Sequence, residues 1–381
     1  MDARAVTPAG RAPRSAAATR RSAEDRPATG QAEQDRDQAA AGRSAEDRPT
    51  IDPPGEDHTR PVDERTRPIT ADSPEAVRRA RAREKTARER AEAVRGGVRA
   101  LADWLADVAD AGIAGLPARD AAWWHAITAR MVDAQAKGLA SAVEELRSLV
   151  AAGGRTWAHD AADRLGGLHL LTRSAEADAP VVRRRLGYAV TEEEARAGEG
   201  WTDRWLPLLR LDTDDGLVRT VRQWVWGRAH GWVVAIRHAG GGARPEPLLP
   251  HGVEVTGVLH PYPGVAPRRV AAGELGEGGL PGPLPAPPDW RTALADVADV
   301  LRGDPWQRLH PVGCASARLT ADTRRLVDGT GRALPVRADL ALDQAVALTA
   351  GDPFDAWGLW NGRELALGAI AAPGEPPEVV G

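Results

Sequence analysis

Tryptophan and arginine alternate through residues 201–237, the stretch of the sequence whose side chains most clearly indicate a binding chemistry. Proteins that bind single-stranded nucleic acid combine a basic groove with aromatic rings on which the bases stack. The chain has 13 tryptophans but one phenylalanine, so these rings are favoured as core residues, and a docking face for a protein is a further alternative. The residues that we predict to contact a nucleic acid or a protein partner are Arg219, Arg222, Trp224, Trp226, Arg228 and Trp232.

The rest of the sequence lacks the residue patterns of common enzymes. A serine nucleophile on a Gly-x-Ser-x-Gly turn is not present. The nine histidines show neither His-x-His nor His-Glu-x-x-His spacing, and the glycine-rich runs lack the lysine of a phosphate-binding loop. His159 with Asp160 and Asp163 could form an acid–base cluster, but acids near a helix start mostly serve the helix dipole. We therefore predict no catalytic residue, no cofactor and no enzymatic activity.

Cys314 is the only cysteine, which rules out a disulfide within the chain and makes a cysteine-based zinc site nearly impossible. No metal site is predicted. The N-terminus has no apolar signal region, and no apolar run reaches about 18 residues, so the sequence predicts a cytoplasmic protein without membrane contact. The net charge of −4 is unevenly spread, but this weak polarity requires no particular partner.

Residues 73–200 carry helical periodicity. Five aliphatic side chains, three or four positions apart, share one helix face: Val94, Val98, Leu101, Leu105 and Val108. Glycine and proline at 112–117 end this helix, and Asp120 is a plausible N-cap for the next. Further helices are predicted over 120–150, 156–174 and 181–186, followed by a capping box at 191–194. The sequence therefore predicts an α-helical bundle over 73–200.

The beginning of this bundle is strongly basic, with nine bases against three acids from Val77 to Arg99. Such a stretch could be an arm that grips phosphates. More often it is a solvated helix that leads into a helical hairpin, and this interpretation is favoured.

The remaining chain predicts an α+β protein with several parts. Alternation with period two indicates short strands after residue 201, in a twisted sheet or a partly closed barrel. Whether the C-terminal strands extend this sheet is left open. The predicted parts are a disordered low-complexity tail over 1–72, the helical bundle, a small antiparallel β domain over 201–273, a Gly/Pro linker over 274–288, an α+β segment over 289–372 and a disordered tail over 373–381.

Four segments carry a resemblance to a known family. They are RALADWLADVADAGIAGLP at 99–117, WWHAITARMVDAQAKGLA at 123–140, VRQWVWGRAHGWVVAI at 221–236 and HPYPGVAPRRV at 260–270. Together they resemble the region that follows the zinc knuckle in bacterial SWIM zinc-finger proteins. The resemblance covers roughly residues 75–273.

The resemblance implies a body for protein interaction, working beside AAA+ ATPases and von Willebrand A-type proteins. In that family, zinc is bound by a Cys-x-Cys pair and a Cys-x-His pair, which are absent from this sequence. The function predicted is therefore a non-enzymatic interaction or scaffold protein without the zinc-binding motif. The alternative is a nucleic-acid-binding module that uses the basic helix and the Trp/Arg-rich β face.

Overall fold

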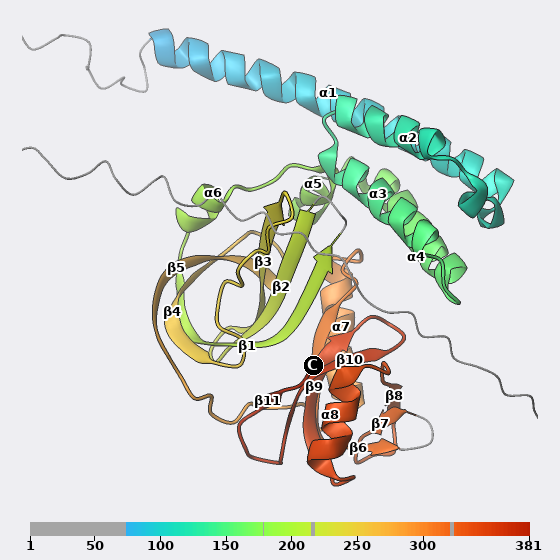
Figure 1. Ribbon diagram of the computed structural model, residues 1–381. Helices are drawn as coiled ribbons and strands as arrows, with labels where there is room; N and C mark the ends of the chain where they lie inside the picture. The colour runs from blue at the N-terminus through green and yellow to red at the C-terminus, as the bar shows by residue number, and fades with distance from the viewer. Residues whose placement is uncertain (1–73, 178, 215–217, 321–323) are drawn as a thin grey trace, which may run out of the picture. The chain divides into compact units, whose positions relative to one another are not determined.

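The computed structural model describes residues 74–177, 179–214, 218–320 and 324–381 (Figure 1). The predicted disordered tail over 1–72 lies outside the described residues. By its internal contacts the chain divides into residues 1–68 and 69–381, and every described residue belongs to the second unit. Helices come first along this unit and strands follow, so the predicted α+β class is confirmed.

The N-terminal helices pack around one apolar core, which includes Leu101, Met131, Leu139 and Leu146. Val94, Val98, Leu101, Leu105 and Val108 are all buried on one face of the first helix, as their spacing predicts. The elements are α1 (Pro74–Ala111), η1 (Ile113–Ala118), α2 (Ala121–Asp133), α3 (Lys137–Ala152), α4 (Trp157–Ser174), α5 (Pro180–Leu186) and α6 (Glu192–Arg196).

The prediction of one helix from 120 to 150 is wrong. The chain breaks between α2 and α3, where Gln135 adopts a left-handed conformation with φ of 56°. Packing explains the break, because α3 begins against the end of α5. A Cβ atom on Gly138 would lie 2.1 Å from the carbonyl oxygen of Arg185. Trp124 of α2 is buried in the core, and its neighbour Trp123 packs partly buried against it.

Five strands form a closed barrel in the order β1-β2-β3-β5-β4. Its interior holds Trp205, Val225, Val233 and Leu259. The antiparallel prediction holds for every neighbouring pair except β3 and β5, which are parallel, because β5 closes the barrel along the free edge of β3. This is the strand order of five-stranded Greek-key barrels of the OB type. The strands are β1 (Trp201–Asp214), β2 (Val218–Gly227), β3 (Gly231–Gly240), β4 (Glu254–Pro261) and β5 (Arg268–Gly279).

The C-terminal strands form a sheet of their own, in the order β11-β10-β9-β6-β7-β8, with two helices (Figure 1). The sequence alone does not decide whether these strands extend the barrel or form a separate sheet. An Asn-Gly pair is a strong signal for a hairpin turn, and Asn361-Gly362 lies in the turn that joins β9 to β10. The elements are α7 (Trp290–Gly303), β6 (His310–Thr320), β7 (Arg325–Val327), β8 (Ala333–Pro335), α8 (Leu340–Thr349), β9 (Phe354–Trp360), β10 (Leu365–Ala371) and β11 (Glu378–Val379).

Two segments predicted to lack structure are ordered. The linker prediction is wrong for residues 274–279, which continue β5 and pair with β4. The prediction of a disordered tail over 373–381 is also wrong, because β11 pairs with β10 and Val380 is buried. Both segments are held by backbone pairing to neighbouring strands, which the composition of a segment does not reveal.

The barrel and the second sheet share an apolar cluster. Leu206, Leu209 and Trp224 on the outside of the barrel pack against Trp357 and Leu359 of β9. The approach is close enough that a Cβ atom on Gly368 would lie 2.7 Å from Leu209.

Candidate functional site

The three predicted tryptophans lie together on the outer face of the barrel. Trp224 is 4% exposed and belongs to the cluster shared with the second sheet. Trp226 and Trp232 are directly opposite one another on β2 and β3, with ring centroids 5.3 Å apart in an edge-to-face arrangement. They are partly buried against the same cluster. The structure thus supports the core interpretation for Trp224, whose ring has no free face for a base.

The three predicted arginines do not gather into one basic surface. Arg219 pairs with Asp214, with Nε 2.6 Å from Oδ2. Arg222 donates to the hydroxyl of Thr213 at 3.4 Å. Arg228 follows β2 and binds a buried carboxylate at the opposite end of the strand. Two of the three charges are therefore matched by a carboxylate within the chain.

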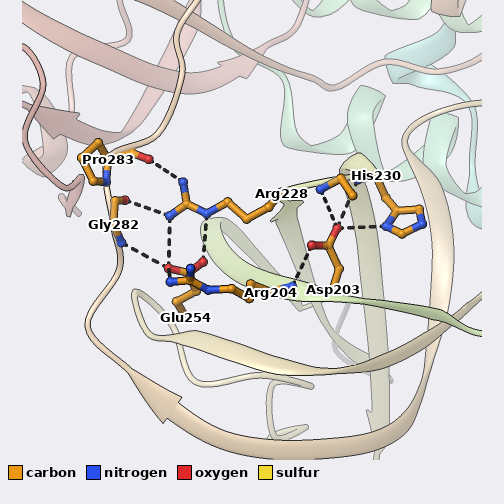
Figure 2. Close-up of polar contacts among 8 residues, drawn as sticks. Asp203, Arg204, Arg228, His230, Glu254, Gly282 and Pro283 are labelled. Carbon is orange, nitrogen blue, oxygen red and sulfur yellow. Dashed lines mark hydrogen bonds and ion pairs between the residues drawn. The ribbon is translucent and has the colours of Figure 1, made fainter.

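Glu254, the first residue of β4, is the carboxylate that binds Arg228 (Figure 2). Its side chain is 3% exposed. Arg228 Nε donates to Oε1 at 2.9 Å, and Arg204 Nη2 donates to Oε2 at 3.1 Å. The backbone N–H of Gly282 donates to the same Oε2 at 3.2 Å. One carboxylate thus joins the beginning of β4, the β2–β3 hairpin and the segment that follows β5.

Arg228 completes this arrangement, because it also donates to the carbonyl oxygens of Gly282, at 3.0 Å, and of Pro283 (Figure 2). Burial by itself would raise the pKa of Glu254. The hydrogen bond from Arg228, the Gly282 N–H and the charges of Arg228 and Arg204 outweigh it and hold the pKa below its usual value. Glu254 is therefore ionised at neutral pH and suited to fixing the chain rather than donating a proton.

Asp203 fixes the β2–β3 hairpin from β1 (Figure 2). Its Oδ2 accepts from the backbone N–H of Ala229 at 2.9 Å, the N–H of His230 at 3.1 Å and the ring Nδ1 of His230 at 2.9 Å. Burial raises the pKa of Asp203, but these hydrogen bonds outweigh it and the net shift is downward. The hairpin loop is therefore held by a second ionised carboxylate.

An aromatic stack covers the same end of the barrel. The His230 ring stacks on Trp201 at 4.7 Å and on Trp205 at 5.8 Å. Arg268 lies over the Trp201 ring at 5.3 Å, a distance that favours a cation–π contact. Gly227 must lack a side chain, since a Cβ atom there would lie 2.5 Å from Trp205. Sequence reasoning missed Asp203, Glu254 and His230, because no local pattern marks them.

A third carboxylate joins the helices to the C-terminal segment. Asp304 follows α7 and is 1% exposed. It accepts from Arg184 Nη2 at 2.8 Å and from Arg185 Nη2 at 3.2 Å, both at the end of α5. Removal of one partner from such a buried pair leaves an uncompensated charge. The acid–base cluster considered at residues 159–163 has a similar role, because Asp160 and Asp163 both bind Arg363.

Comparison with known families matches the helical region. Residues 89–185 match the model of the SWIM-associated four-helix bundle domain. The match begins within α1 and ends within α5, so the predicted resemblance is confirmed over these residues. No curated protein and no solved structure matches the chain.

Zinc is the metal that a SWIM association implies, and the residues present do not fit it. Cys314 is fully buried on β6, and burial, followed by the charges of Asp328 and Asp289, raises the pKa of its thiol to about 12. The zinc knuckle of that family needs three thiolates and an imidazole, and Cys314 is the one cysteine in the sequence. Among the described residues, no three His, Cys, Asp or Glu side chains are placed to share a metal ion.

None of the described helices is both long and apolar enough to cross a membrane.

Proposed function

We propose that this chain is a non-enzymatic interaction protein, and that α8 is the surface that binds its partner. The observation that carries the proposal is the exposure of large aliphatic side chains on this helix. Leu340 is 62% exposed, Leu348 59% and Val346 51%. The opposite side of α8 buries Ala341, Leu342 and Ala345 in the core beneath the second sheet. A helix that is apolar on all sides is typically covered on all sides.

Leu340 and Leu348 are about two turns apart on α8, and Gln344 between them accepts a hydrogen bond from the backbone N–H of Gly381 at 2.7 Å. An amphipathic helix that places its apolar side chains in a groove is one common mode of recognition. Asp343 and Asp352 are exposed nearby. We therefore propose a partner with an apolar groove and a basic rim.

The partner class follows from the SWIM association rather than from the shape of α8. AAA+ ATPases and von Willebrand A-type proteins are the classes that the resemblance implies, and we propose one of them as the partner. Glu254, Asp304 and Arg363 each join segments far apart in the sequence, so the part of the chain that carries α8 is held in a fixed shape.

The proposal is tested by binding of the full chain to a purified AAA+ ATPase and to a purified von Willebrand A-type protein. We expect the Leu340→Glu and Leu348→Glu variants to lose binding at least about tenfold, since each places a charge in an apolar contact. Val132→Glu on α2 is the matched control, because Val132 is 51% exposed and lies on another helix. Equal binding by all three variants would contradict the role of α8, and no binding by the unaltered chain would contradict the partner class.

The alternative function is nucleic-acid binding through the basic helix and the Trp/Arg face. The burial of Trp224 and the pairing of Arg228 weigh against the second part of this alternative. The exposure of residues 77–89 of α1 favours the part of this alternative that assigns binding to the basic helix.

A further inference from the structure

The beginning of α1, up to Glu89, has no covering among the described residues, and Arg90 is where contact with the residues after α5 begins, through the carbonyl oxygen of Gly187 at 3.0 Å. Val94 is the first buried residue of this helix, and residues 77–89 are all exposed. Figure 1 shows this part of α1 extending past the ends of α2, α3 and α4. We call residues 74–93 the arm. Its helical state depends on alanine and on pairs such as Glu75–Arg79 and Glu84–Arg88 rather than on packing.

The cations of the arm outnumber its acids, and four of them, Arg78, Arg81, Lys85 and Arg88, share one face of the helix. Arg78 and Arg81, at the tip, are exposed and have no carboxylate partner within the described chain, and neither has Arg83. Further along, Glu92 pairs with Arg95 and Arg99. Lys85 and Arg88 also have carboxylate partners, Glu89 and Glu84. The row of basic residues on this face continues past the arm at intervals of three, four or seven positions: Arg78, Arg81, Lys85, Arg88, Arg95 and Arg99. They span about 32 Å at a rise of about 1.5 Å per residue.

A helix that needed only to be soluble and stable would alternate its charges. Here Arg79 and Arg83 are four positions apart, as are Arg81 and Lys85, and like charges at this spacing destabilise a helix. The arm therefore carries positive charge that its own structure does not neutralise. A bound polyanion would remove this repulsion, so the charge is explained by a ligand and not by the fold.

From this placement we infer that the arm binds the phosphate backbone of a nucleic acid, without reading its sequence. Val77 is the only large apolar residue between 74 and 93, which disfavours both insertion into a membrane and a protein interface with an apolar centre. Phosphates spaced along a strand match a row of cations, and the release of condensed counterions supplies affinity without apolar contact. This inference gives the nucleic-acid alternative its own site and does not depend on α8.

The test uses the full chain and a fluorescent DNA duplex of about 20 base pairs, longer than the row of cations, with binding measured from about 50 to 200 mM salt. The Arg78→Gln/Arg81→Gln/Lys85→Gln variant removes three neighbouring charges of this row. We expect the slope of log K against log salt to become less negative by about 2.7, because each phosphate that the variant no longer neutralises accounts for about 0.9 of the slope. Far-UV circular dichroism should show helicity equal to or above that of the unaltered chain.

The matched control is Arg130→Gln/Arg173→Gln/Arg291→Gln, which removes the same charge from exposed positions on α2, α4 and α7. Its slope should stay within experimental error of the unaltered chain. Equal loss of affinity in both variants would overturn the inference, because net charge alone would then explain binding. Binding to an acidic polyglutamate peptide but not to DNA would overturn it in favour of an acidic protein. The Leu340→Glu variant should bind DNA as the unaltered chain does. A failure of the α8 proposal can therefore be distinguished from a failure of the inference about the arm.

Discussion

The barrel and the arm both contain many arginines, and the two regions use them in opposite ways. In the barrel, Arg228 and Arg204 share the buried Glu254, and Arg219 pairs with Asp214. In the arm, Arg78 and Arg81 are exposed without a carboxylate partner among the described residues. The barrel arginines that have carboxylate partners hold the chain to itself, whereas Arg78 and Arg81 of the arm are available to a ligand. The number of arginines in a stretch therefore indicates little until their partners are known.

The largest expected effect concerns the barrel side of this comparison. Glu254→Gln leaves Arg228 and Arg204 without their shared charge, and we expect the free energy of unfolding to fall by about 3 kcal/mol. Urea denaturation measures this change. Glu277→Gln is the control, because Glu277 is exposed on β5 and its loss should change stability by less than about 0.5 kcal/mol. Equal effects in the two variants would show that Glu254 does not hold the barrel.

A second expectation separates packing from binding at Trp224. Trp224→Ala should lower the free energy of unfolding by about 3–5 kcal/mol, because it empties a buried site between the barrel and the second sheet. The affinity of the remaining folded protein for DNA should not change. Fluorescence polarisation on the folded fraction measures that affinity. A fall in affinity at unaltered stability would return Trp224 to the role of a stacking residue.

The pH dependence of stability sharpens the first prediction. The pKa of Glu254 is lower in the folded chain than the usual value of about 4.3, so its ion pair contributes fully above that pH. This contribution is lost as the pH falls through the folded-state pKa. The difference in the free energy of unfolding between the unaltered chain and Glu254→Gln should therefore be constant near neutral pH and become smaller in acid. A difference that widens below about pH 4 would contradict the assignment.

Local patterns were enough to predict several elements. The spacing from Val94 to Val108 located the buried face of α1, and the capping box of Thr191 and Glu194 is present with both of its hydrogen bonds. The Asn-Gly pair at 361–362 likewise indicates the hairpin turn that joins β9 to β10. These features depend on residues within a few positions of one another, so the sequence displays them directly.

Features that depend on distant segments could not be predicted. The glycine-rich end of β5 resembles a linker, yet Gly278 allows the close approach of Val253 in the pairing with β4. The helix α8 is apolar on both sides and shows little periodicity. The Glu254–Arg228 pair joins residues 26 positions apart, and only the strand register brings them together. The candidate site was therefore predicted as a set of arginines and tryptophans, but not as the hydrogen bonds and ion pairs that hold them.

The most direct test compares equal charge removal in the two regions. Arg78→Gln/Arg81→Gln in the arm and Arg219→Gln/Arg222→Gln in the barrel each remove two positive charges. The salt dependence of binding to the same DNA duplex is measured for both. We predict that the arm variant flattens the slope of log K against log salt by about 1.8, while the barrel variant leaves it unchanged. An equal or larger change from the barrel variant would contradict the assignment of ligand binding to the arm.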